Sequence, residues 1–399
     1  MFAVLTRARK ALRTAVLIGA AGLLAACDAS MIGGMASGGN ASRGGPTIDP
    51  TQPVRVALLL PYSDSSAGPI ARDLENAARL AISELGATRI DLRIYDTAGS
   101  PAQAAQQAQL AVDEGAKIIL GPLRGETAVE ASKVVADEGI NVMSFSNNTS
   151  LAGGNLFILG PTFLNTADRL MSYGKRNGID SVAILHSQDV PGEFGKSAIQ
   201  LAASKNGVRV AAVQGYPLSI DGVSGVARNM SQVVNGSGAK SVFITSDATN
   251  AAMPLILQLM PEGGVSPAST QYIGLTRWDV APQLFSYPGA DGAWFTMPNQ
   301  SMQQAFASRY RAAYGAEPHP LAGLAFDGIA AIGALVKQGR RDALTGGALT
   351  QGSGFQGTGG VFRLKSDGTN ERGLAIATVR NNQVVILDPA PSSFSGAGF

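Results

Sequence analysis

The feature that most constrains the fold is an alternation of short apolar runs with segments of helical periodicity, which starts at residue 54. The first run, VRVALLL, is typical of a buried strand, and the apolar residues from Ile70 to Leu85 recur at helical spacing. Strands that alternate with helices predict a parallel sheet with helices on both faces. The predicted strands here are 54–60, 90–95, 116–120 and 141–146, with later helices at 101–114 and 127–138.

The same alternation starts again after residue 163 and predicts a second sheet of similar size. Its predicted strands are SVAIL (181–185), VRVAAVQG (208–215), KSVFITS (240–246) and TQYIGL (270–275). The helices that precede them are predicted at 164–177, 194–205, 223–234 and 251–260. The fold class is therefore α/β, with two Rossmann-like halves.

The last part of the chain has a different pattern. An apolar segment at 292–298 is followed by helical stretches at 301–314 and 321–337. Three short β-rich runs, VFRL, LAIATVR and QVVIL, come next. The turns SDGT (366–369) and RNNQ (380–383) between them predict an antiparallel meander.

Open α/β sheets bind ligands at the carboxyl ends of their strands, so the residues that follow the predicted strands are candidates for a ligand cleft. In the first half these are Tyr62, Ser63, Arg124, Gly125, Glu126, Thr127, Ser146, Asn147 and Asn148. In the second half they are His186, Phe194, Asp247, Thr276 and Trp278.

An ordinary structural role stays open for several of these residues. Arg124 either binds a carboxylate or faces solvent, and His186 lies either in the cleft or in a plain loop. Trp278 either stacks on a ligand or packs in the core, whereas Trp294, inside the apolar GAWFTMP, is predicted to be a core residue. The other histidine, His319 in EPHPLAG, is predicted to be structural because the flanking prolines set a rigid loop.

The N-terminus has the features of an export signal. Arg7, Arg9, Lys10 and Arg13 precede the apolar run 15–26, which is too short to span a bilayer but suits a signal-peptide core. The string Leu-Ala-Ala-Cys at 24–27 resembles a bacterial lipobox, which implies cleavage before Cys27 and lipidation of its sulfur. An ordinary secretory signal with an incidental cysteine is the alternative.

The segment 28–52 carries six glycines and few large apolar residues, so it is predicted to be a flexible tether. Four basic side chains lie in the signal, and the rest of the chain keeps 27 basic against 29 acidic ones. A mature protein so close to neutral has no basic surface of the kind that binds nucleic acid.

The sequence favours a protein that is not an enzyme. GSGFQG (352–357) has the spacing of a dinucleotide loop but no predicted strand before it or helix after it, and GKS (195–197) lacks the upstream glycine of a phosphate loop. The two histidines are far apart, and Cys27 is the only cysteine. We therefore expect no metal site, no cofactor and no nucleophilic catalysis.

The stretches DEGAKIILGPL and GINVMSFS resemble the type I periplasmic binding proteins, in the leucine/isoleucine/valine-binding branch, over about residues 54–387. Within that branch, three strings are similar to the penicillin-binding-protein activator lipoproteins of alphaproteobacteria. They are FSNNTSLAGGNLFILGPTF, IGLTRWD and HPLAGLAFDGIAAIGALVKQG.

This resemblance implies two lobes joined by three crossings, near 160–163, 294–298 and 354–360. The implied division is a signal at 1–26, a tether at 27–52, lobe 1 at 53–162 plus 296–356, lobe 2 at 163–295 plus 357–390, and a tail at 391–399.

The resemblance also implies where a ligand contacts the protein. The amino-acid binders of the family hold a zwitterion through hydroxyls in the first lobe, an aromatic residue and an acid in the second lobe. These positions fall at Gly125, at Ser146 and Asn148, at Phe194, and near Thr276 for the acid. A threonine cannot pair with a buried ammonium as a carboxylate does, which argues against a standard amino acid, although Glu126 or Asp247 could substitute.

Two functions are therefore expected as alternatives. The first is a periplasmic lipoprotein, anchored to a bacterial membrane through Cys27, that regulates peptidoglycan synthesis by contact with a penicillin-binding protein. The second is a receptor that delivers an amino acid or another small polar solute to an ABC permease. Whether the inner or the outer membrane holds the anchor stays open, because Asp28 favours inner-membrane retention in some bacteria whereas well-known activators sit in the outer membrane.

Overall fold

The first half of the chain forms a parallel sheet, sheet A, as its alternating pattern predicts. The computed structural model describes residues 45–394. The strands of sheet A are β1 (Val54–Leu60), β2 (Ile90–Asp96), β3 (Ile118–Leu120), β4 (Val142–Ser144) and β5 (Leu156–Ile158). Their order is β2-β1-β3-β4-β5, and every neighbouring pair is parallel.

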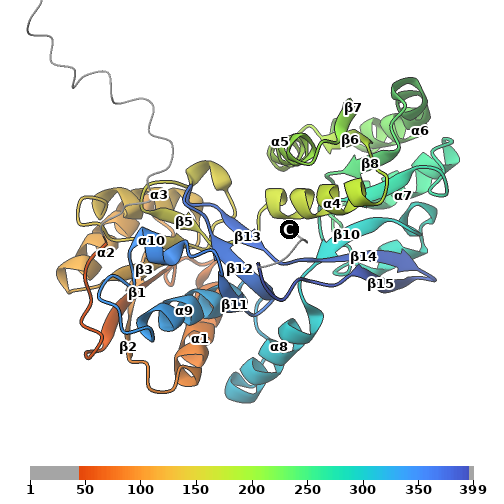
Figure 1. The fold of residues 1–399 in the computed structure, drawn as a ribbon. Coiled ribbons are helices and arrows are strands. Elements are labelled where there is room, and N and C mark those ends of the chain that lie inside the picture. Colours follow the sequence, from red (N-terminus) through yellow and green to blue (C-terminus); the bar gives the residue numbers. More distant parts are fainter. Residues whose placement is uncertain (1–44, 395–399) are drawn as a thin grey trace, which may run out of the picture. The chain divides into compact units, whose positions relative to one another are not determined.

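Helices cover both faces of sheet A because successive side chains of its strands point to opposite faces. Leu58 and Leu60 of β1 pack in one core with α1 and α9, whereas Ala57 and Leu59 pack in another with α2 and α3. Helix α9 comes from late in the chain and lies beside α1 (Figure 1). These helices are α1 (Gly68–Glu84), α2 (Pro101–Asp113), α3 (Gly125–Val134) and α9 (Ala322–Val336), with the short α10 (Gly346–Leu349) next to α9.

The second half of the chain forms sheet B from the same alternation of strands and helices. Its strands are β6 (Ser181–Ser187), β7 (Arg209–Tyr216), β8 (Ser241–Ile244), β9 (Gln271–Gly274), β10 (Trp294–Met297), β14 (Ala375–Arg380) and β15 (Gln383–Asp388). The order is β15-β14-β10-β9-β8-β6-β7. From β7 to β10 the strands are parallel and repeat the order of sheet A, whereas β14 and β15 are antiparallel additions at one edge.

Sheet B is also covered on both faces, and local signals fix where its helices begin. The core on one face contains residues of α4 and α5, and the core on the other contains residues of α6 and α7. Thr162 and Asn165 form a capping box at the start of α4, and the Asp189 side chain accepts a hydrogen bond from Gly192 N–H at the start of α5. The helices of sheet B are α4 (Phe163–Arg176), α5 (Val190–Lys205), α6 (Ile220–Ser237) and α7 (Ala252–Glu262). Helix α8 (Gln300–Tyr314) contacts α1. The 3-10 helices are η1 (Thr149–Leu151), η2 (Pro282–Ser286) and η3 (Pro288–Ala290).

The prediction of one antiparallel meander in the tail is wrong. The run VFRL forms β12 (Gly360–Leu364), which pairs with β11 (Phe355–Gly357) and β13 (Asn370–Arg372) in a separate sheet C. Strand β14 instead pairs with β10, because its apolar side chains complete the cores of sheet B. The hairpin β14–β15 is confirmed, and Asn381 and Asn382 take the positive φ angles that its tight turn requires.

Within residues 45–394 the chain passes between the elements of sheet A and those of sheet B three times: after β5, after β10 and after β13. The first and third passages contact each other. The Asn370 amide donates to the carbonyl oxygens of Ile158, at 2.8 Å, and Gly160, at 2.9 Å. The Asn165 amide in turn donates to the carbonyl oxygen of Asn370 at 2.9 Å. Sheet C therefore ties these connections together.

Candidate functional site

The carboxyl end of β1 places Tyr62 and Ser63 at the edge of sheet A, where ligands bind in open α/β folds. Both hydroxyls are already used by the protein. The Tyr62 hydroxyl donates to Glu75 of α1, and the Ser63 hydroxyl donates to Asp96 at the end of β2. Ser63 remains exposed, so it is the more accessible of the two.

A pocket of about 760 Å³ lies farther along the same edge, between the start of α3 and the loop after β4. It contains several of the residues that the sequence predicts for the cleft. The pocket is lined by Arg124, Gly125, Glu126, Ser146, Asn147 and Asn148, together with Pro101, Val129, Glu130 and Leu151. The structure therefore brings six of the predicted residues together, from two strand ends.

Of the charged groups in this pocket, Arg124 is paired with a carboxylate and Glu126 has no ion-pair partner among the described residues. The Arg124 guanidinium lies 2.5 Å from a carboxylate oxygen of Asp64, and 48% of the Arg124 side chain is exposed. A hydrogen bond from the Ser66 hydroxyl, others from the backbone N–H groups of Ala67 and Ser66, and the charge of Arg124 lower the pKa of Asp64 below its ordinary value. Glu126, in the first turn of α3, makes no ion pair among the described residues, and the helix N-terminus favours its negative charge.

The uncharged residues of this edge mostly stabilise the loops in which they lie. Thr127 is buried, and its hydroxyl donates to the Arg124 carbonyl oxygen at 2.7 Å. Ser146 Oγ accepts from Asn148 N–H at 3.1 Å, and Asn148 Oδ1 accepts from Ser150 N–H at 3.0 Å. Asn147 is exposed, and it is the residue of this group most available to a ligand.

The edge of sheet B carries the second group of predicted residues. His186 is buried, with Nδ1 3.0 Å from the Ser187 carbonyl oxygen and 3.4 Å from Glu193 Oε1. Phe194 of α5 is 50% exposed. Asp247 Oδ1 accepts from Thr249 N–H at 2.8 Å. The Thr276 hydroxyl donates to the Ser246 carbonyl oxygen at 3.3 Å.

Both tryptophans pack against the cores of sheet B, but they differ in burial. Trp278 is fully buried in the core of sheet B and stacks on Phe295, with ring centroids 6.0 Å apart. Its ring therefore offers no face to a ligand, which settles its open assignment in favour of the core. Trp294 is only partly buried, and its ring meets Tyr173 edge-on at 5.0 Å.

Buried hydroxyls at the edge of sheet B are further functional candidates. Tyr216 ends β7, and Thr245 and Ser246 follow β8; the Tyr216 hydroxyl lies beside those of Ser187 and Ser246. The buried Thr245 hydroxyl has no hydrogen-bond partner among the described residues. Burial raises the pKa of Tyr216 above its ordinary value. Only the position of these residues at strand ends could have pointed to them.

The structure supports the structural interpretation of His319. Its Nδ1 accepts a hydrogen bond from Leu321 N–H at 3.2 Å, and its backbone N–H donates to Asp73 Oδ2 at 3.2 Å. Between residues 45 and 394, no cluster of three or more His, Cys, Asp or Glu side chains could hold a metal ion. No helix in this part of the chain has the length and apolar character to cross a bilayer. Cys27 lies outside the described residues.

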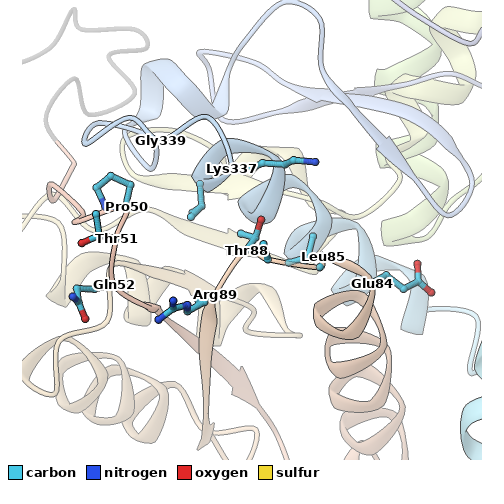
Figure 2. A pocket seen from close by; sticks show the side chains of 12 residues that line it. Pro50, Thr51, Gln52, Glu84, Leu85, Thr88, Arg89, Lys337 and Gly339 are labelled. Atoms are coloured by element: carbon cyan, nitrogen blue, oxygen red, sulfur yellow. The ribbon is translucent and has the colours of Figure 1, made fainter.

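Another hollow lies at the opposite edge of sheet A and contains none of the predicted residues. Figure 2 shows it between the end of α1, with Glu84 and Leu85, and Lys337 after α9, with Arg89 on the strand side. Both helices end here, so their carbonyl groups give the hollow a negative partial charge. Lys337 complements that charge, which is a sufficient structural reason for its presence.

Comparison with known proteins identifies the family. Residues 53–383 match the family model described as periplasmic binding protein. A Rhodospirillum rubrum protein described as a branched-chain amino acid ABC transporter is 17% identical, with a TM-score of 0.72 over 84% of this chain and 100% of that one. A substrate-binding protein of Desulfitobacterium hafniense in complex with Leu is 17% identical, with a TM-score of 0.58 over 84% and 100% of the two chains.

A third structure has a similar fold. A solute-binding protein of Rhodopseudomonas palustris in complex with 3,4-dihydroxybenzoic acid is 18% identical, with a TM-score of 0.53 over 85% of this chain and 98% of that one. No curated protein matches the chain. The family match covers most of the sequence and coincides with sheets A, B and C, so the chain belongs to the periplasmic binding protein family and has the leucine-binding-like type I fold.

Proposed function

We propose that the chain is a lipid-anchored, non-enzymatic protein of the periplasm that regulates peptidoglycan synthesis by contact with a penicillin-binding protein. The resemblance of FSNNTSLAGGNLFILGPTF, IGLTRWD and HPLAGLAFDGIAAIGALVKQG to activator lipoproteins suggests this role. The single structural observation that supports it is Thr276. Thr276 lies near the position where amino-acid binders of the family carry an acid, and its hydroxyl donates a hydrogen bond to the Ser246 carbonyl oxygen.

The other carboxylates at this edge are engaged in local contacts. Asp189 accepts from the Ser187 hydroxyl at 2.6 Å and caps α5, and Asp247 accepts from Thr249. Glu193 pairs with Lys196 and lies beside His186. A buried ammonium without a free carboxylate costs several kcal/mol, on the order of the penalty for an uncompensated buried charge. A standard amino acid is therefore a poor ligand for this edge.

We also propose that sheets A and B are the centres of two lobes, with lobe 1 at 53–162 plus 296–356 and lobe 2 at 163–295 plus 357–390. In this proposal the passages after β5 and β10, together with sheet C, in whose first strand the 356/357 boundary falls, act as the hinge. Lipid on Cys27 and the tether to residue 52 hold the lobes at a membrane surface.

A second candidate function is a receptor that delivers a small polar solute to an ABC permease. The pocket between α3 and the loop after β4 favours it, because Arg124 and Glu126 there offer one positive and one negative group. Its volume of about 760 Å³ lies within the range of small-molecule sites. The structural neighbours described above are transport proteins, which also supports this candidate.

Two measurements separate the candidates. The purified lipidated protein is added to a penicillin-binding protein of the same organism, and the rate of glycan polymerisation is measured. The proposed regulator raises that rate, whereas a transport receptor leaves it unchanged.

In parallel, thermal unfolding is followed with a library of amino acids and organic acids. A receptor ligand at one hundred times its Kd stabilises the fold by about 2.7 kcal/mol, and such a shift without any effect on polymerisation rejects the regulator in favour of the receptor.

A further inference from the structure

Strand β15 forms a free edge of sheet B. It pairs only with β14, and within residues 45–394 no other segment forms hydrogen bonds with its backbone. Arg380 and Gln383 flank a two-residue turn, so they form a hydrogen-bonded pair, and bonded and non-bonded pairs alternate from there. Val384 and Ile386 therefore point their N–H and C=O groups outward, away from β14.

This edge lacks the usual protection of an exposed strand. Charged side chains, prolines, short length or bulges normally keep such an edge from pairing with another chain. Residues 383–387, QVVIL, carry no charge and no proline, and the bulge of the hairpin lies only at the Asp388 end. Val385 and Ile386 are 38% and 41% exposed and point to opposite faces of the sheet. Strand β2, at an edge of sheet A, instead carries three charged residues.

The side chains on the α4 side of this edge carry an excess of positive charge. Arg169 and Arg176 of α4 share one acid, Asp388, at 3.0 and 3.2 Å. Arg380, at the end of β14, lies near the same part of α4, is exposed and makes no ion pair among the described residues. Asp291 lies on the other side of β14 from β15. Three guanidinium groups therefore accompany one carboxylate beside the open edge, and this favours an acidic partner.

An extended peptide adds to an open edge through main-chain hydrogen bonds, while its alternate side chains give specificity. We propose that β15 binds an extended segment of a partner protein, in which apolar residues alternate along the strand and acidic residues lie at one end. The apolar residues cover Val385 and Ile386, and the acidic residues meet Arg380 and Arg176. A second copy of this chain is disfavoured, because its own edge carries the same excess of positive charge. The inference does not depend on the proposed function.

The probe is a fluorescein-labelled acidic peptide, Asp-Glu-Val-Thr-Val-Thr-Val-Thr-Gly-Ser, titrated with the full-length protein by fluorescence anisotropy. A basic peptide begins with Lys-Lys instead, and a broken peptide has Pro in place of the central Val. Ile386→Pro removes an outward N–H group, which an edge strand tolerates, and Arg380→Ser removes the unpaired charge. Ile220→Pro is the matched control, because Ile220 is 75% exposed and is the first residue of α6, where proline fits a helix. Circular dichroism confirms that each variant folds.

Hydrogen exchange of single amides gives a second readout, which a general change of stability does not reproduce. Bound acidic peptide is expected to slow the exchange of the Val384 and Ile386 amides, because they gain a hydrogen-bond partner. The Val385 amide, which points toward β14, should change less. If Ile386→Pro does not fold, this alternation and the comparison of the three peptides decide the matter.

We expect saturable binding of the acidic peptide, weakened at least about tenfold by the basic peptide, by the broken peptide and by Ile386→Pro. Arg380→Ser and added salt weaken it as well, and Ile220→Pro leaves it unchanged. The proposal is overturned if the wild type does not bind the acidic peptide, if it binds the basic peptide equally well, or if folded Ile386→Pro binds as the wild type does. It is also overturned if ultracentrifugation shows a dimer of the wild type that Ile386→Pro converts to a monomer, because a second copy then covers the edge.

Discussion

Trp278 stacks on Phe295 across the interior of sheet B, with the two rings 6.0 Å apart and 16° from parallel. Since Trp278 is fully buried, Trp278→Ala leaves a large cavity and lowers the free energy of unfolding by about 3–5 kcal/mol. Urea unfolding measures this loss. Trp294→Ala is the matched control and costs less, because Trp294 is partly exposed. Equal losses in the two variants contradict the burial described for Trp278.

Removal of Arg372 leaves the Asp327 carboxylate buried without its ion-pair partner. Arg372→Met is therefore expected to lower the free energy of unfolding by about 3–5 kcal/mol. Arg340→Met breaks an exposed pair with Asp342 and costs much less, because solvent screens that pair. The combination of Asp327→Leu with Arg372→Met recovers part of the loss, since neither charge then stays unpaired. A loss of less than about 1 kcal/mol in Arg372→Met rejects this role for the pair.

The pKa of Asp96 is below its ordinary value of 3.8. Partial burial raises it, but hydrogen bonds from the Ser63 hydroxyl and from the backbone N–H groups of Ala98 and Ser63 lower it by more. A carboxyl group whose pKa is lower in the folded state than in the unfolded state stabilises the fold at pH values above the unfolded-state pKa. This contribution is lost as the pH falls through the folded-state pKa.

The prediction is that Ser63→Ala makes the free energy of unfolding less dependent on pH in the acid range below about pH 4. Urea unfolding of the wild type and the variant at neutral pH and in acid measures the difference. The wild type should lose more stability than the variant on acidification. The same loss in both proteins shows that the bond from Ser63 to Asp96 does not hold the pKa down.

Lipidation of Cys27 is a prediction from the sequence alone. Cys27→Ser is expected to move the protein from the membrane to the soluble periplasmic fraction and to abolish incorporation of labelled palmitate. Ser30→Ala, three residues further on, should change neither readout. A Cys27→Ser protein that still sediments with membranes requires an anchor other than lipid. Separation of inner from outer membranes in the same experiment decides which one holds the wild type.

The alternation of apolar runs and helical segments predicted most strands of sheets A and B, because the central strands of a covered parallel sheet are continuous apolar runs. Strand β5 was not among the predicted strands. Strand β1 at 54–60 and helices α8 and α9 lie within a residue of their predicted bounds. Pairing at the end of the chain was not predictable in this way. The run LAIATVR can pair with QVVIL in a hairpin or with the edge of sheet B. In the fold it forms β14, which pairs with β15 on one side and with β10 on the other.

Local sequence also says little about which strand-end residues stay available to a ligand. Thr127, Asn147 and Trp278 all come after predicted strands, yet only Asn147 is exposed. The ion pair of Asp327 with Arg372 joins residues from a helix and a later strand, which no local pattern connects.

The most direct test of the central claim is capture of the native partner. The full-length protein is cross-linked in cells, purified from detergent-solubilised membranes, and its partners are labelled with fluorescent penicillin. A labelled penicillin-binding protein is expected to copurify with the wild type. Recovery of an ABC permease, with no penicillin-labelled band, contradicts it and establishes the transport receptor instead.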